Sequence, residues 1–164
     1  MTGVPMEEHT YRECGLYLIK DSYFSDFPSD LHMKNKGESR PHYFAVRAEN
    51  GIYWMVPLSS KVEKYRAKIE QAKRTHGDSL FYHIGRIKGE DRVFLVGNVI
   101  PVTEHYIKKA FTVKGVPYIV KNKTDIKKIK SKVRRYLVLV KQGKLKPYVD
   151  ILEIEKQLIA KDLV

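Results

Sequence analysis

The sequence predicts an α+β fold: a compact, strongly twisted and mainly antiparallel sheet with helices packed on it. Two pairs of short apolar runs, each joined by a glycine-containing turn, predict β-hairpins at residues 43–56 and 80–96. Three later segments repeat apolar residues at spacings of three and four, as amphipathic helices do. The 164 residues, 43% of them hydrophobic, suffice for one real core, so we expect a single domain over residues 1–164.

The first third of the chain contains a leader, a strand and the first hairpin. Residues 1–12 are expected to form a loose leader, and residues 15–19 a first strand. Little periodicity follows up to residue 36, which indicates a loop or short helical turns. In the hairpin, Asn50 and Gly51 separate the two apolar runs, and Asn-Gly predicts a type I′ turn with positive φ at both residues.

The remaining elements are a helix from residue 61 to about 74, the second hairpin, and two further helices. The second hairpin strand is expected to continue to residue 100, followed by a helical turn over 103–109 and a short edge strand over 116–120. Thr124 is expected to cap a helix that ends near residue 142, with Gly143 closing it. A last helix, residues 151–161, begins with a capping box of Asp150 and Glu153, and its expected packed residues are Ile151, Ile154, Leu158 and Ile159.

Composition narrows the function. A net charge of +12 and a pI near 9.6 indicate a polyanionic partner, either nucleic acid or an anionic membrane. No apolar run approaches the roughly 20 residues of a membrane span, and the polar start MTGVPMEEHTYRE is not a secretory signal. Cys14 is the only cysteine, which excludes an internal disulfide and a multi-cysteine zinc site and suits a reducing cytoplasm. We therefore expect a cytoplasmic protein.

Metal and cofactor chemistry is not expected. The six histidines are not spaced as a metal-ligand pair, and the predicted strands lack the converging acids of a two-metal nuclease. A phosphate-binding P-loop is absent, which argues against an NTPase. Neither RRM nor zinc-finger signatures occur.

Most of the positive charge lies in one segment. Residues 121–146 hold eleven basic side chains and one acidic, whereas residues 1–39 hold four basic and seven acidic. A solvated helix face is the simpler interpretation, but a face without counter-charges repels itself unless a polyanion covers it. We therefore predict nucleic-acid contacts here. The residues expected to bind RNA, which also include Lys64 of the preceding helix, are Lys64, Lys121, Lys123, Lys127, Lys128, Lys130, Arg134, Arg135, Lys144 and Lys146.

The start of the first predicted helix combines several phosphate-binding features. Ser60 with Glu63 fits a capping box, and capping alone would explain the serine. A helix start is also a seat for phosphate, because its amides are unpaired and partly positive. Here it carries the hydroxyls of Ser59 and Ser60, with Lys61 next to them.

A ribonuclease that works without metal is compatible with these residues. RNA carries its own nucleophile, the 2′-hydroxyl, so cleavage needs a base, an acid and cations around the phosphorane. Ser, Tyr, Lys, Arg and His can fill these roles. Such an enzyme should cut RNA and leave DNA intact, because DNA lacks the attacking group.

The chain resembles the toxins of type III toxin–antitoxin systems, the ToxN/AbiQ superfamily, and its CptN branch in particular. The segments that carry the resemblance are GLYLIKDSYF, RPHYFAV with YWMVPLSSKVEKY, and FLVGNVIPVTEHYI, from about residue 15 to 158. It implies a fold similar to Kid/MazF toxins and a sequence-selective, metal-independent endoribonuclease that leaves a 2′,3′-cyclic phosphate and a 5′-hydroxyl. It also implies an inhibitor, a repeated pseudoknot RNA that the toxin itself processes, held in a closed protein–RNA hetero-oligomer, and growth arrest linked to abortive infection of phage.

The resemblance also implies site residues. The serine that ends the family's Pro-Leu-Ser/Thr-Ser stretch falls on Ser60, with Ser59 before it. The basic residue upstream of the hairpin falls on Arg40, and the tyrosine after the first strand falls on Tyr23. From its place alone, Tyr23 is more often a packed residue at the end of a strand than a catalytic one. Relatives often carry lysine two places after the serine, where this chain has a valine, so either Lys61 or Lys64 would support the phosphate, with Lys61 nearer the helix start.

Two rival functions stay open on the sequence. A non-catalytic RNA-binding module would use the same basic surfaces, with Tyr43, Tyr53 and Trp54 stacking bases, although sheet aromatics are more often core. Peripheral membrane binding is disfavoured, since the basic helix lacks large apolar anchors outside its core stripe.

Overall fold

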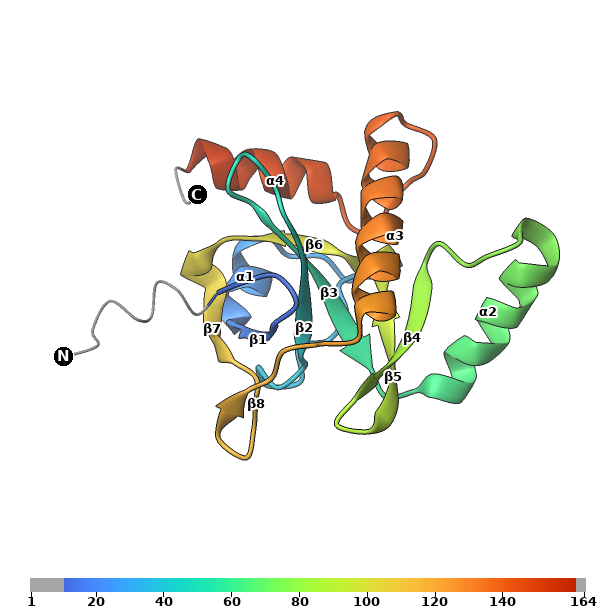
Figure 1. The fold of residues 1–164 in the computed structure, drawn as a ribbon. Coiled ribbons are helices and arrows are strands. Elements are labelled where there is room, and N and C mark those ends of the chain that lie inside the picture. Colours follow the sequence, from blue (N-terminus) through green and yellow to red (C-terminus); the bar gives the residue numbers. More distant parts are fainter. Residues whose placement is uncertain (1–10, 162–164) are drawn as a thin grey trace.

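Seven short antiparallel strands form the centre of the protein (Figure 1). The structure, a computed structural model, describes residues 11–161. The strands pair in the order β4-β5-β3-β2-β1-β7, with β6 also pairing with β3, and a separate two-stranded hairpin joins β8 to β9. Their bounds are β1 Leu16–Ile19, β2 His42–Arg47, β3 Tyr53–Ser59, β4 Tyr82–Ile87, β5 Glu90–Leu95, β6 Ile100–Val102, β7 Ile107–Ala110, β8 Thr112–Val113 and β9 Val116–Pro117.

Strand β3 is the centre of this sheet, since all seven of its residues are buried. One edge of β3 pairs with β2; the other pairs first with β6 and then with β5. The sequence suggested that the second strand of the second hairpin continues to residue 100, but β5 ends at Leu95. A 3-10 turn over Val96–Asn98 interrupts it where Gly97 packs under Phe81, whose Cδ1 would lie 3.0 Å from any Cβ at this position.

Both predicted hairpins are present, but the expected turn type is wrong at the first. Among the residues of its loop only Gly51 has positive φ, at 89°. The Gly51 amide donates to the Ala48 carbonyl at 3.0 Å, and Ala48 in turn donates to Ile52 at 2.9 Å. These bonds describe a three-residue loop with a glycine bulge. Two positive φ values occur instead at the β4–β5 turn, at Lys88 and Gly89.

Four helices cover the sheet within residues 11–161: α1 Asp21–Asp26, α2 Val62–His76, α3 Lys123–Lys141 and α4 Ile151–Ala160. In Figure 1, α3 crosses in front of the sheet, α4 lies along the top, and α2 stands to one side. Helix α3 packs on β2 and α4 on β6, whereas α2 contacts β4 and β5. Helix α3 has one apolar stripe, in which Ile126 is half-buried and the buried residues are Ile129, Val133, Tyr136, Leu137 and Val140.

Helix α2 has a small hydrophobic cluster of its own. The buried members are Tyr65 on the helix and Val93 and Leu95 on β5. The large core that surrounds β2 and β3 is a separate cluster. The helix thus packs on the sheet through a small apolar cluster that is separate from the main core.

The cap of α3 differs from the prediction. Asn122 is the N-cap, and its Oδ1 accepts a hydrogen bond from the Asp125 amide at 2.9 Å, so the helix begins before Thr124. At the other end Gly143 has a φ of 71°, which confirms the expected glycine after the last turn.

Replacing Asn122 with Ala should lower the free energy of unfolding by about 1 kcal/mol, the typical loss when an N-cap side chain is removed. Thr124→Ala is the matched control, since the Thr124 side chain caps nothing here. Chemical denaturation followed by circular dichroism measures both variants. Equal losses in the two variants would contradict the assignment of the cap.

The last helix has half of the predicted capping box. Asp150 Oδ1 accepts from the Glu153 amide at 3.2 Å, but the Glu153 carboxylate accepts from the Gln157 side chain instead of returning to Asp150. The prediction that Ile159 packs against the core is wrong, because its side chain is 43% exposed.

The connecting segments also differ in part from expectation. The predicted helical turn after residue 103 is a 3-10 helix, Glu104–Tyr106, followed directly by β7. Of the predicted edge strand, β9 covers the start, and Ile119 forms an isolated bridge with Gly15. Of the predicted loose leader, residues 1–10 lie outside the described residues, whereas Tyr11 is tied to the sheet by a 2.8 Å bond from Arg47 to its carbonyl.

Candidate active site

A groove of about 260 Å³ lies at the end of β3, between the loop that precedes β2 and the β4–β5 turn. It brings together three of the predicted catalytic residues, Arg40, Ser59 and Ser60, which are up to 20 positions apart in the sequence. Three cations that the sequence did not single out also line it, and these are Lys36, Lys88 and Arg92.

Arg40 is fixed by two backbone carbonyls. Its Nε donates to Lys34 and its Nη1 to Leu58, both at 2.6 Å, and the residue is only 6% exposed. Burial lowers the pKa of its guanidinium, yet arginine keeps its proton in proteins. The remaining amino group, Nη2, has no hydrogen-bond partner within residues 11–161, and Arg40 is one of the residues that line the groove.

The two serines occupy different environments at the end of β3. Ser59 is buried, pairs with Val93 of β5, and accepts a 3.1 Å hydrogen bond from the Lys61 amide at its Oγ. Ser60 is exposed, and no hydrogen bond of its hydroxyl occurs in the described part of the chain. Its predicted capping box is wrong: the helix start has no side-chain cap, and Glu63 binds Arg66 instead. The Ser60 hydroxyl is therefore available to a ligand. Of the amides at the helix start, that of Lys61 donates to Ser59 Oγ and that of Val62 donates to the Ser60 carbonyl at 2.9 Å.

The predicted lysines of α2 lie beside the groove and do not line it. Lys61 and Lys64 are exposed, and the Lys64 ammonium lies 5.2 Å from the ring centroid of Tyr65. Lys36 and Lys88 line it instead, both with positive φ in tight turns. A local signal for these turns exists in Lys36-Gly37 and Lys88-Gly89, but nothing in the sequence indicates that the turns face the same groove.

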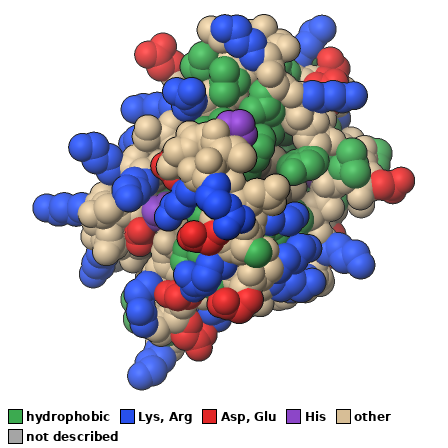
Figure 2. Space-filling view, turned by 90° about the vertical axis from the view of Figure 1, so that its right-hand side faces the viewer, with side chains coloured by type: hydrophobic (Ala, Val, Ile, Leu, Met, Phe, Trp, Pro, Cys, Tyr) green, Lys and Arg blue, Asp and Glu red, His purple; other side chains and the backbone are tan. Residues whose placement is uncertain are grey.

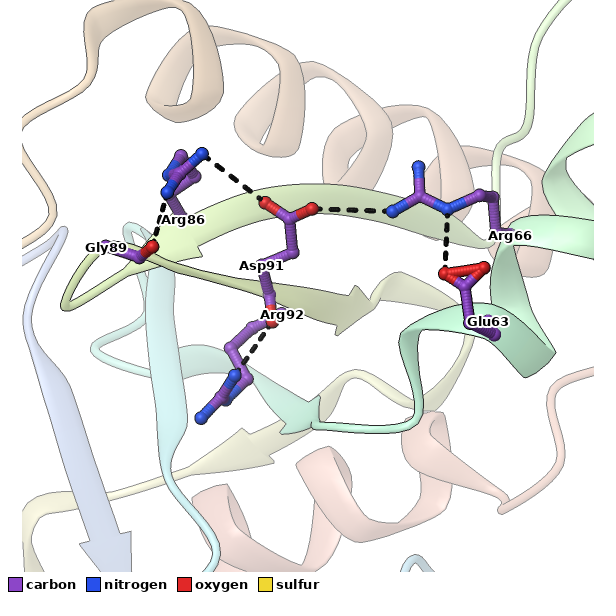
Figure 3. Close-up of polar contacts among 6 residues, drawn as sticks. All are labelled: Glu63, Arg66, Arg86, Gly89, Asp91 and Arg92. Atoms are coloured by element: carbon purple, nitrogen blue, oxygen red, sulfur yellow. Dashed lines mark hydrogen bonds and ion pairs between the residues drawn. The ribbon is translucent and has the colours of Figure 1, made fainter.

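Arg92 reaches the groove from β5 and is held by its neighbours. Its Nη2 forms an ion pair with Glu90 at 2.7 Å, and its Nη1 donates to the Asp91 carbonyl at 2.8 Å. Figure 3 shows Arg92 directed away from the Asp91 carboxylate, which lies on the other side of the strand. There Asp91 binds Arg66 of α2 at 3.4 Å and Arg86 of β4 at 4.0 Å, and this links the helix to the hairpin.

The structure does not place Tyr23, which the resemblance suggested as a catalytic residue, in the groove. The side chain is fully buried, and its hydroxyl donates to the Pro101 carbonyl at 2.7 Å. Burial raises the pKa of Tyr23 well above its usual value. Its ring packs edge-on against Tyr106 at 5.3 Å between centroids. Tyr23 is therefore a core residue whose hydroxyl proton already forms a hydrogen bond to a backbone carbonyl.

Ordinary acid–base side chains do not line the groove. Among its described lining residues none is Asp, Glu or His. The nearby His42 is buried behind Arg40, with its Nδ1 3.0 Å from the Arg40 carbonyl, and burial lowers the pKa of His42 to about 4. Within residues 11–161, no three His, Cys, Asp or Glu side chains come together as a metal site would require. The groove offers cations and hydroxyls, a chemistry suited to holding a phosphate diester.

Most of the predicted RNA-binding residues lie exposed along α3 and the segments at its two ends, whereas Lys64 lies on α2. Lys130 is partly buried and its ammonium forms an ion pair with Glu13 at 2.7 Å, so it is not free for a polyanion. Figure 2 shows the face that carries α2, which is studded with Lys and Arg side chains, while Asp and Glu gather mainly in its lower half. The exposed members of the predicted set are Lys64, Lys121, Lys123, Lys127, Lys128, Arg134, Arg135, Lys144 and Lys146.

In the part of the chain that the structure describes, no helix has the length and apolar character needed to cross a membrane.

Comparison with known proteins identifies the fold. No protein-family model and no curated protein matches the sequence. Among solved structures, the chain is similar to AbiQ, a lactococcal anti-phage endoribonuclease belonging to the type III toxin–antitoxin system, with 18% identity and a TM-score of 0.62 over 92% of this chain and 99% of that one. It is also similar to ToxN, from a bacterial antiviral system regulated by a processed non-coding RNA, with 16% identity and a TM-score of 0.60 over 87% and 95% of the two chains. The chain therefore has the ToxN/AbiQ fold.

Proposed function

We propose that this protein is the toxin of a type III toxin–antitoxin system, a metal-independent and sequence-selective endoribonuclease. The observation that carries the proposal is the groove at the end of β3, where Arg40, Ser59 and Ser60 meet in a chain with the fold of an endoribonuclease. The branch of the superfamily that the sequence favours is CptN.

In the proposed reaction the 2′-oxygen of RNA attacks phosphorus and the bond to the 5′-oxygen breaks. The products are a 2′,3′-cyclic phosphate and a 5′-hydroxyl; one proton leaves the 2′-oxygen and one reaches the 5′-oxygen. Arg40, with Lys36 and Arg92 on the groove walls, would neutralise the charge that develops on the phosphorane. This assignment uses the fixed Arg40 guanidinium, whose Nη2 has no hydrogen-bond partner within residues 11–161.

The Ser60 hydroxyl would donate a hydrogen bond to a non-bridging phosphate oxygen. A serine is a poor base unless a neighbour activates it, and the described residues that line the groove include no histidine or carboxylate to do so. Positioning of the phosphate is therefore the role that the geometry supports better than proton transfer. The two protons would then move through water or through a lysine amine.

The proposed partners are a target RNA and an RNA antitoxin, a repeated pseudoknot that the toxin processes and then retains in a closed hetero-oligomer in the cytoplasm. The protein from the bacterial antiviral system supports this partner class, since a processed non-coding RNA regulates that system. The exposed basic surface along α3 supplies the cations that an RNA backbone needs.

Ser60→Ala tests the proposed activity. Cleavage of a synthetic RNA in EDTA should fall about 100-fold or more, the usual loss when one donor to a developing oxyanion is removed, whereas RNA affinity should stay within about twofold. Ser25→Ala, at an exposed serine of α1, is the control. The product ends, read by mass spectrometry, should be 2′,3′-cyclic phosphates, and the matching DNA should remain intact.

A non-catalytic RNA-binding module is the second candidate, favoured by the lack of carboxylate and imidazole groups along the described walls of the groove. Absence of cleavage by the wild-type protein, or equal loss of cleavage and binding in Ser60→Ala, would favour it over the enzyme. In either case Tyr43, Tyr53 and Trp54 do not stack on bases as suggested from the sequence, because all three are buried in the core.

A further inference from the structure

A second groove continues the candidate active site past the β4–β5 turn. It encloses about 730 Å³ and lies between this turn, β9 and the segment that leads into α3. Neighbouring residues of the turn face the two grooves in succession: Ile87 and Lys88 line the candidate active site, whereas Arg86 and Gly89 line the second groove. We call the second groove the flanking groove.

A hydrogen bond joins the two grooves. The Lys88 amide donates to the Tyr118 hydroxyl at 3.1 Å, and Tyr118 lines the flanking groove. The Tyr118 backbone is itself held on both sides, since its amide donates to Phe111 at 2.9 Å and its carbonyl accepts from Leu16 at 3.1 Å. The ring is thus fixed to β1 through its backbone and to the turn of the candidate active site through its hydroxyl.

The lining of the flanking groove combines apolar walls with cations. Val116, which is 64% exposed, and Pro117 stand beside the half-buried Tyr118 ring. Arg12 and Lys121 supply positive charge, and both are exposed. No Asp or Glu belongs to the described lining. An aromatic or apolar surface next to unpaired cations is the chemistry that binds single-stranded nucleic acid, with bases on the ring and phosphates on the cations.

We propose that the flanking groove binds the single-stranded RNA that adjoins the scissile phosphate, with one base stacked on Tyr118 and the backbone held by Arg12 and Lys121. The inference rests on the proposed function for the direction of the strand. It adds a subsite that would contribute to sequence selectivity, because the base on Tyr118 lies at a fixed distance from the phosphate on Arg40. The volume lies within the usual range of small-ligand sites.

Binding can be measured without cleavage by using a fluorescein-labelled, mixed-sequence 12-nucleotide RNA with 2′-O-methyl groups, since the methylated oxygen cannot attack phosphorus. Tyr118→Ala should weaken binding about tenfold in fluorescence anisotropy, because the ring is lost. Tyr118→Phe should bind within about twofold of wild type, because the ring remains. Arg12→Gln should bind several-fold more weakly and with a shallower salt dependence.

Matched controls are Tyr148→Ala, an aromatic that is 49% exposed elsewhere, and Lys156→Gln, an exposed cation on α4. Both should bind as wild type. Thermal unfolding shows whether Tyr118→Ala is folded; should it not be, Arg12→Gln decides, since the described residues give its exposed side chain no hydrogen bond that the substitution would remove. Wild-type affinity of both Arg12→Gln and a folded Tyr118→Ala would overturn the inference.

Photo-crosslinking locates the strand directly. A 4-thiouridine in the same oligonucleotide should form adducts in the peptide that contains residues 116–121. Adducts found solely in α3 peptides would overturn the inference. The outcome is separable from that of the proposed function: weakened binding in Tyr118→Ala with no cleavage by wild type would leave the subsite and remove the enzyme, whereas cleavage that depends on Arg40 but not on Tyr118 would do the reverse.

Discussion

RNA cleavage should fall about a thousandfold or more when Arg40 is replaced by Gln. The guanidinium is the cation most firmly fixed in the groove, because its Nε and Nη1 both donate to backbone carbonyls at 2.6 Å. Glutamine removes the charge from the proposed phosphate site and cannot hold both carbonyls. The free energy of unfolding should fall as well, by about 1.5–3 kcal/mol, the contribution of one hydrogen bond from a charged group.

Single-turnover cleavage and urea denaturation separate these two effects. Arg40→Lys keeps a cation but can bond to fewer carbonyls, so it should lose stability while retaining more cleavage than Arg40→Gln. Arg74→Gln removes an exposed arginine at the end of α2 and should change neither quantity. Cleavage by folded Arg40→Gln at the rate of Arg74→Gln would exclude Arg40 from the reaction.

Replacing Tyr23 with Ala should destabilise the fold by about 3–5 kcal/mol, the range for large aromatic side chains deleted from a core. The ring is fully buried and packs against Phe24, Phe27 and Tyr106. Tyr23→Phe keeps the ring but leaves the buried Pro101 carbonyl without its 2.7 Å donor, and should lose about 1–3 kcal/mol.

The activity of Tyr23→Phe distinguishes a structural from a catalytic tyrosine. At a temperature where the variant is fully folded, its cleavage rate should equal that of wild type. Tyr148→Phe, at an exposed position, controls for loss of a phenol that bonds to no carbonyl. A large loss of rate in folded Tyr23→Phe would mean that the hydroxyl reaches RNA in a conformation other than this one.

Local signals were enough to predict both hairpins and the long helices, whereas contacts between distant segments decided where the elements end. Asn50-Gly51 indicated the first hairpin, yet its loop closes through Ala48 and Ile52, so the turn is not the two-residue type. The break between β5 and β6 depends on Phe81 packing over Gly97, which no local pattern contains. Thr124 and Asn122 are both good cap residues, and the sequence did not distinguish them.

In the candidate site, too, local signals predicted some residues, whereas contacts between distant segments placed the others. The pair Ser59-Ser60 follows a predicted strand, and Arg40 precedes the strand that pairs with it, so hairpin geometry brings them to one end of the sheet. Lys88 and Arg92 come from the second hairpin, whose place beside β3 could not be predicted from periodicity. The burial of Tyr23 could not be predicted, because strand ends do not reveal whether a phenol faces solvent or core.

The separate packing of α2 divides the stability of the sheet from the charge beside the groove. Because Tyr65 with Val93 and Leu95 forms a cluster apart from the main core, the outer surface of α2 contributes little to the stability of the sheet. The helix starts at Val62, two residues after Ser60, so changes in its exposed lysines would alter the charge beside the groove without disturbing the strand that holds the serines. On the proposed function, such changes would alter the charge that an RNA meets beside the groove while the folded core stays the same.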